Sequence, residues 1–150
     1  MTNSFFFFVD VSVGIKQFVP DPLNAKVNQL FACLAYPGVE FFVPDLFYIE
    51  SGNTLWKYVR AGLYEAADVP ADLASLKAFD LTSISTGELV EEAVAIALAY
   101  GITAYDASYV ALSKRVSAPF LTLDRKLINA LATATYDLRL FSDFSIPSLS

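Results

Sequence analysis

Short apolar runs alternate along the chain with longer segments in which apolar positions recur every three to four residues. The first run, at residues 4–10, contains five consecutive apolar residues and ends in Asp10, as expected for a buried strand of a parallel sheet. Similar runs at 40–43, 79–84, 119–123 and 138–141 predict further strands, and a short apolar run at 102–105 precedes Asp106. The alternation predicts a single α/β domain with three layers, in which helices cover both faces of a mostly parallel central sheet.

Helical spacing accounts for most of the remaining chain. The apolar positions predict helices at 13–19, 21–36, 45–60, 64–79, 85–100, 106–116 and 125–131. Asp45 is placed to cap the third of these, and the Ser85-x-x-Glu88 spacing is that of a capping box, in which Glu88 bonds backbone donors. Gly101 marks the end of the helix that begins at Ser85.

Three aspartates fall where strands are predicted to end and helices to begin. Asp10 and Asp124 follow apolar strands, and Asp106 follows the apolar run at 102–105. Because parallel strands have their carboxyl ends at one edge of the sheet, where open α/β sheets bind ligands, we expect these carboxylates to lie together. Taken singly, Asp106 and Asp124 also suit the role of helix N-caps.

A fourth acid, Glu50, lies in the apolar helix predicted at 45–60. Glu50, Asn53 and Lys57 share one face of that helix at spacings of three and four, among large apolar residues such as Phe47 and Trp56. A buried carboxylate without a partner is costly. Glu50 therefore belongs to a functional site, forms an ion pair with Lys57 or a neighbour, or lies on the polar face of an amphipathic helix.

Four segments together resemble the PIN-domain ribonucleases, a family that includes the toxins of many prokaryotic toxin–antitoxin pairs. The segments are VDVSV at 9–13, PDLFYIESGN at 44–53, YDASYVAL at 105–112 and TLDRKL at 122–127, and the resemblance spans nearly the whole chain. Carried over position by position, it implies an acidic metal site composed of Asp10, Glu50, Asp106 and Asp124. The polar neighbours that it implies are Ser12, Asn53 and Thr122.

The resemblance also implies an activity, hydrolysis of RNA phosphodiester bonds with Mg²⁺ or Mn²⁺. These ions prefer hard oxygen ligands, and they activate water, orient phosphate and stabilise the leaving oxygen. We expect Asp10 and Asp106 to be primary ligands, Asp124 to be a ligand or a base, and Glu50 to act through water. Asn53 and Thr122 would orient water or phosphate, whereas Ser12 fits equally well as the cap of the helix after the first strand.

Cysteine and histidine content narrows the chemistry. The chain has no histidine and one cysteine, which excludes an internal disulfide, most zinc sites and histidine-based catalysis. Cys33 lies in an apolar helical pattern and is expected to be a buried structural thiol. The apolar run at 5–9 is far shorter than the roughly 20 residues of a membrane helix, and no basic segment precedes it as in a signal peptide. We therefore expect a cytoplasmic protein.

Net charge bears on nucleic-acid binding in two ways. A charge of −6 argues against it, because phosphate binding normally requires a basic surface. Seven of the ten basic residues nevertheless lie within ten positions of a proposed site acid, namely Lys16, Lys57, Arg60, Lys114, Arg115, Arg125 and Lys126. They form either a basic rim around an acidic metal pocket or ordinary solvated helix faces, and for Lys114 and Arg115 the second interpretation is at least as good.

Partners and alternative functions complete the expectations. Tyr105 and Tyr109 suit either stacking on an RNA base or packing in the core. An aromatic content of 15% with apolar helices favours a homodimer, and the resemblance implies an antitoxin protein over the acidic groove.

One alternative function is that of a haloacid-dehalogenase-like phosphatase with Asp10 as nucleophile, although Ser12 stands where a second aspartate is needed. Another is a non-catalytic metal-site module that binds a protein or RNA.

Overall fold

A parallel sheet with helices on both faces forms the centre of the molecule. The computed structural model describes residues 5–149, and the five strands among them are ordered β3-β2-β1-β4-β5, with every neighbouring pair parallel. The strands are β1 (Phe5–Val9), β2 (Val39–Pro44), β3 (Leu81–Ile84), β4 (Phe120–Thr122) and β5 (Leu138–Leu140). The α-helices are α1 (Val11–Gly14), α2 (Asn24–Ala32), α3 (Leu46–Arg60), α4 (Val69–Ala78), α5 (Thr86–Tyr100), α6 (Ala104–Val116) and α7 (Arg125–Ala130).

The phenylalanine run of β1 shows why the sheet is covered on both sides. Phe7 and Phe8 are both fully buried, but they belong to different clusters of core residues because successive strand residues face opposite sides. Phe7 packs with Phe31 of α2 and Phe41 of β2, whereas Phe8 packs in the cluster that contains α5, α6 and α7. Burying each such side chain contributes about 1.5–3 kcal/mol. The predicted three-layer α/β/α architecture is confirmed.

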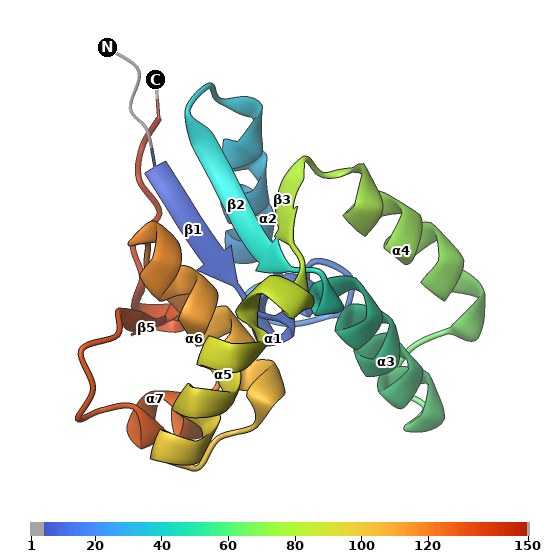
Figure 1. Ribbon diagram of the computed structural model, residues 1–150. Coiled ribbons are helices and arrows are strands. Elements are labelled where there is room, and N and C mark those ends of the chain that lie inside the picture. The colour runs from blue at the N-terminus through green and yellow to red at the C-terminus, as the bar shows by residue number, and fades with distance from the viewer. Residues whose placement is uncertain (1–4, 150) are drawn as a thin grey trace.

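The helices follow the sheet in the arrangement of Figure 1. In this view α5 and α6 lie against each other on one face of the sheet, and α2 lies behind the sheet. The helices α3 and α4 lie next to each other on the right, beside β3. Cys33, in the 3₁₀ turn after α2, is buried as expected. Within residues 5–149, no single helix has the length and apolar composition needed to span a membrane. Only α5 and α6 taken together meet these two requirements, and they are bent by 113° relative to each other.

The structure differs from two local predictions near the starts of α6 and α3. Residues 102–105 form no strand, because α6 begins at Ala104 and its cap is Thr103, whose hydroxyl accepts from the Asp106 N–H at 3.1 Å. Asp45 occupies the N-cap position of α3, but its side chain accepts no hydrogen bond from that helix. Its carboxylate instead accepts from the Thr86 N–H at 3.1 Å, so Asp45 connects the end of β2 to the first turn of α5.

The capping box is only half formed. Ser85 caps α5 by accepting from the Gly87 N–H at 3.1 Å, but Glu88 forms an ion pair with Arg115 of α6 at 3.7 Å. An exposed pair of this kind contributes little to stability. It does, however, help to explain how α5 and α6 are aligned.

Candidate active site

Acidic side chains converge where β1, β2 and β4 end. Asp10 directly follows β1, and Asp124 lies two residues after β4, the strand that pairs with β1. Glu50 is in the second turn of α3, which begins immediately after β2. In Figure 1 the arrowheads of β1 and β2 point toward α1 and the start of α3, so the side chains that follow these strands gather at one edge of the sheet.

Asp10 is held by two hydroxyl groups. Ser12 Oγ donates to one carboxylate oxygen of Asp10, and Thr122 Oγ1 donates to the other at 2.6 Å. The two hydroxyl oxygens also accept hydrogen bonds from the backbone. Ser12 Oγ accepts from the Leu123 N–H at 2.9 Å, and Thr122 Oγ1 accepts from the Asp124 N–H at 3.0 Å. Asp10 is therefore fixed in orientation and connected directly to the loop that carries Asp124.

Burial dominates the electrostatics of Asp10, whose residue is only 8% exposed. Burial raises the pKa of Asp10 from 3.8 to about 6, although the hydrogen bonds from Ser12, Thr122 and the Val13 backbone favour the charged form. The charge of Asp106 raises this pKa further. Near neutral pH the carboxylate is charged but poorly compensated, which is an environment that attracts a cation.

Glu50 has a specific partner that the sequence did not indicate. The hydroxyl of Tyr109, on α6, donates to Glu50 Oε1 at 2.9 Å. Burial raises the pKa of Glu50, the Tyr109 hydrogen bond lowers it, and the charges of Asp106 and Asp10 raise it. Burial and the neighbouring Glu50 also hold the pKa of Tyr109 well above its usual value, so its hydroxyl stays protonated. No ion pair with Lys57 occurs among the described residues, and that interpretation of Glu50 is wrong.

Asp106 and Asp124 differ in their local roles. Asp106 lies in the first turn of α6 but is not its cap. Its pKa is raised most by burial and next by the charge of Asp124. Asp124 is the N-cap of α7, since its Oδ1 accepts from the Leu127 N–H at 3.1 Å. The capping alternative therefore holds for Asp124, at the expense of one carboxylate oxygen, and fails for Asp106.

These acids influence one another in a connected series. Asp106 raises the pKa of both Asp10 and Glu50, and Asp124 raises that of Asp106. The ion pairs found within residues 5–149 involve other acids, namely Asp21, Glu88, Glu92 and Asp137. No three acidic or cysteine side chains in the described part of the chain lie close enough together to hold a metal ion as they stand.

Comparison with known proteins gives the family. A family model described as "PIN domain" matches residues 7–132, which include all four of these acids. The chain belongs to the PIN-domain family. This assignment removes the phosphatase alternative and agrees with the segments that carried the resemblance.

Individual relatives agree with the assignment. This PIN domain is 34% identical over 121 residues to Ribonuclease VapC3 of Pyrobaculum aerophilum, which covers 79% of this chain and 89% of the relative. In fold it is similar to the toxin VapC20 of Mycobacterium tuberculosis, described as cleaving the sarcin-ricin loop, with a TM-score of 0.63, 17% identity and coverage of 87% of this chain and 95% of the other. It is also similar to a chain of a toxin–antitoxin complex from Klebsiella pneumoniae, with a TM-score of 0.55, 17% identity and coverage of 91% and 96%.

The remaining polar and aromatic candidates of the PIN domain are divided between the core and the surface. Ser12 does not cap α1. It lies within that helix and bonds across to Leu123, as described above. Asn53 is exposed on α3, about one turn beyond Glu50. Tyr105 is 66% exposed beside Asp106, whereas Tyr109 is buried with its ring stacked on Phe120 of β4.

The basic residues of the predicted rim differ in their ion pairing. Lys114 and Arg115 form ion pairs with Glu92 and Glu88 of α5, at 3.6 and 3.7 Å, so the solvated-face interpretation holds for them. Lys114 lies eight positions after Asp106, which at about 1.5 Å per residue corresponds to about 12 Å along α6. Arg125 and Lys126 are exposed immediately after Asp124 and form none of the ion pairs within residues 5–149.

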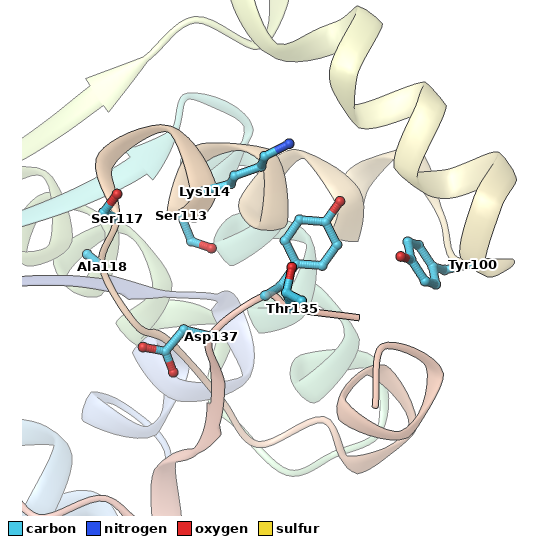
Figure 2. Close-up of a pocket in the computed structure, with 8 residues that line it drawn as sticks. Tyr100, Ser113, Lys114, Ser117, Ala118, Thr135 and Asp137 are labelled. Atoms are coloured by element: carbon cyan, nitrogen blue, oxygen red, sulfur yellow. The ribbon is translucent and has the colours of Figure 1, made fainter. Parts of the chain in front are cut away.

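The cavity of the PIN domain that Figure 2 shows lies away from the predicted site residues. The cavity in Figure 2, of about 380 Å³, lies at the ends of α5 and α6 and before β5, and contains none of the predicted site residues. Its lining is Tyr100, Ser113, Lys114, Ser117, Ala118, Thr135, Tyr136 and Asp137. Two other cavities are lined by sequence neighbours of the acids but by none of the acids themselves. One, of about 350 Å³, includes Ser12 and Leu123, and an apolar one of about 190 Å³ includes Leu46 and Tyr105.

Proposed function

We propose that this PIN domain is a divalent-metal-dependent endoribonuclease that hydrolyses RNA phosphodiester bonds. The observation that supports this most strongly is that Asp10, Glu50 and Asp106 come from three separate parts of the chain, yet Asp106 raises the pKa of both other acids and Asp10 raises that of Glu50. Within residues 5–149, none of the three forms an ion pair with a basic side chain. Structural carboxylates are ordinarily paired, whereas a cluster of uncompensated ones is typical of a cation site. The relative named a ribonuclease supports the choice of reaction.

The donor set suits Mg²⁺ or Mn²⁺. Carboxylate oxygens are the ligands that these ions prefer. A cation would compensate the burial and the smaller mutual repulsion that raise the pKa values of Asp10, Glu50 and Asp106. We infer that binding draws the oxygens closer together, with Asp10 and Asp106 as primary ligands, Asp124 as a ligand or base, and Glu50 acting through water. The ion would supply charge neutralisation and activation of water for attack on the phosphate.

The protein groups around the acids would position the substrate. Ser12 and Thr122 hold the Asp10 carboxylate in one orientation before substrate binds. Asn53 is exposed one turn from Glu50 and would bond a phosphate oxygen. Arg125 and Lys126, which form no ion pair within residues 5–149, follow Asp124 directly and would attract the RNA backbone on either side of the cleaved bond.

The test is RNA cleavage by the purified protein in Mg²⁺ and in Mn²⁺. Asp10→Asn and Asp106→Asn should each abolish metal-dependent cleavage, and EDTA should abolish that of the wild type. Asp80→Asn, which changes an exposed aspartate before β3, is the matched control and should keep full activity. Activity that survives both site substitutions overturns the proposal, and metal binding without cleavage of any RNA favours the non-catalytic module.

A toxin role and its partners extend the proposal. We further propose that this PIN domain is a cytoplasmic toxin whose activity is held in check by an antitoxin protein covering the acidic edge. The names of the relatives, which include a toxin and a toxin–antitoxin complex, support the toxin role. Co-expression with neighbouring small open reading frames followed by pull-down would identify such a partner, and a chain that stays monodisperse and unaccompanied speaks against it.

Self-association is the last part of the proposal. We expect a homodimer because Val90, Val94 and Leu98 form an exposed apolar stripe along α5, with Leu98 82% exposed. Val94→Glu should convert a dimer to a monomer in light-scattering measurements. Glu91→Gln, on the same helix, is the control, and a wild type that is monomeric contradicts this expectation.

A further inference from the structure

The contact between Tyr109 and Glu50 joins two helices that are far apart in the sequence. Tyr109 is only 1% exposed, and its hydroxyl donates to Glu50 Oε1 at 2.9 Å across 59 residues of chain. A buried tyrosine hydroxyl needs a hydrogen-bond partner, and a phenylalanine would fill the same volume without that requirement. The hydroxyl is therefore present for a contact that packing alone does not demand.

The ring of Tyr109 is itself fixed in place. It stacks on Phe120 of β4 with the ring planes 13° apart and the centroids separated by 5.6 Å. Phe120 pairs with Phe8 of β1, the strand that leads to Asp10. The position of the hydroxyl is thus set by the rigid centre of the sheet, next to the strand ends that carry the acids.

The helix that carries Tyr109 also carries Asp106. The two residues are three positions apart on α6 and so lie on the same face. Glu50 is half-buried, and its long side chain has several rotamers that only a specific contact restricts. α6 therefore presents a carboxylate of its own and holds a second one, from α3, beside it.

We propose that Tyr109 is a positioning residue, whose hydroxyl aligns the Glu50 carboxylate with Asp10 and Asp106 before a divalent cation binds. The inference rests on the metal-dependent function proposed above. Tyr109 touches neither the substrate nor the ion and acts only through Glu50. Hydrogen-bond partners of metal-binding carboxylates typically change metal affinity by about 10–100-fold when they are removed, and we expect a loss in that range.

The experiment measures Mn²⁺ affinity of the full chain by calorimetric titration, together with the Mn²⁺ dependence of RNA cleavage. Tyr109→Phe removes only the hydroxyl and keeps the ring on Phe120. The expected result is an Mn²⁺ dissociation constant raised by about 10–100-fold, with most of the cleavage rate recovered at saturating Mn²⁺. Tyr136→Phe, a half-buried tyrosine in the cavity at the other end of the sheet, is the control and should change neither measurement.

A double-mutant cycle separates this role from a general effect on stability. If Tyr109 acts through Glu50, then Tyr109→Phe adds no further loss of Mn²⁺ affinity in a Glu50→Gln background. Additive losses, or a Tyr109→Phe variant that binds Mn²⁺ like the wild type, overturn the inference. A wild type that neither binds Mn²⁺ nor cleaves RNA is a different outcome, because it overturns the proposed function itself.

A second variant covers the case in which Tyr109→Phe does not fold. Glu50→Asp keeps the charge but shortens the side chain by one methylene, which takes the carboxylate away from the Tyr109 hydroxyl. The inference expects a comparable loss of Mn²⁺ affinity. Undiminished affinity in this variant contradicts it, since the alignment by Tyr109 would then be unnecessary.

Discussion

Thr122 donates a hydrogen bond from Oγ1 to Oδ2 of Asp10 at 2.6 Å, from a side chain that is completely buried. Because β1 and β4 are adjacent parallel strands, the residue at the end of one can reach the residue that follows the other. The same Thr122 oxygen accepts from the Asp124 N–H at 3.0 Å. One hydroxyl group thus determines the relative position of two of the proposed metal-binding acids.

Thr122→Val should weaken both the fold and the metal site. Valine has the same shape but leaves a buried carboxylate without one donor and the Asp124 N–H without its acceptor, which costs about 1–3 kcal/mol. Urea unfolding in EDTA measures this loss, and Mn²⁺ titration should show a weaker site. Thr82→Val, at a half-buried threonine of β3, provides the comparison. If the two variants are equally stable, the Thr122 hydroxyl has no special role.

The raised pKa of Asp10 predicts how stability depends on pH without metal. The folded protein holds this proton more tightly than the unfolded chain, whose value is near 3.8. The stabilisation is therefore complete below pH 3.8 and is lost as the pH rises through about 6. The difference corresponds to about 3 kcal/mol at most.

Asp10→Asn isolates that contribution. In EDTA the variant should be more stable than the wild type at pH 7, and the advantage should shrink as the pH falls toward 4, in urea unfolding experiments at several pH values. Saturating Mn²⁺ should reverse the order, because the ion compensates the charge that destabilises the metal-free protein. Parallel pH profiles for the two proteins would contradict the account of Asp10.

Most of the fold, and the positions of two of the acids, could be predicted from the apolar strand pattern of the sequence. Asp10 and Asp124 could be located because buried strands have a strong apolar signal and their ends are sharply marked. The mistake before Asp106 has a simple cause. Ile102, Ala104 and Tyr105 are apolar, but only a few residues separate α5 from α6, and Thr103 starts the second helix with a side-chain cap. Three apolar residues cannot by themselves distinguish a strand from a helix start.

Contacts between distant parts of the chain gave no sequence signal. Tyr109 looked like an ordinary core residue because its apolar spacing on α6 is the same whether or not its hydroxyl has a partner 59 residues away. Ser12 looked like a helix cap, yet it bonds Asp10 and the Leu123 N–H. A single sequence records local propensity and periodicity, whereas these hydrogen bonds depend on how the strands are ordered in the sheet.

The different local roles of Asp124 and Asp106 can be separated by substitution. Asp124→Asn keeps a good N-cap and removes the charge, whereas Asp124→Ala also loses the bond to the Leu127 N–H and should be less stable by about 1 kcal/mol. Asp106→Asn and Asp106→Ala should not differ in this way, since Thr103 caps α6. Thermal unfolding of the four variants in EDTA measures the contrast. An equal contrast at both positions would mean that the two aspartates have the same structural role.

Basic residues near the acids should contribute unequally to RNA binding. Arg125 and Lys126 are exposed next to Asp124 and form no ion pair in the part of the chain that the structure describes. Replacing both with glutamine should therefore raise KM for RNA several-fold and reduce the dependence of binding on salt, with little change in kcat. Lys114 and Arg115 are already engaged by glutamates of α5, and the matched double glutamine variant should bind RNA like the wild type. Both pairs carry two positive charges, so the comparison removes the effect of net charge. Equal losses in the two variants would indicate general attraction to the surface, and loss only at Lys114 and Arg115 would move the RNA path to the opposite end of the sheet.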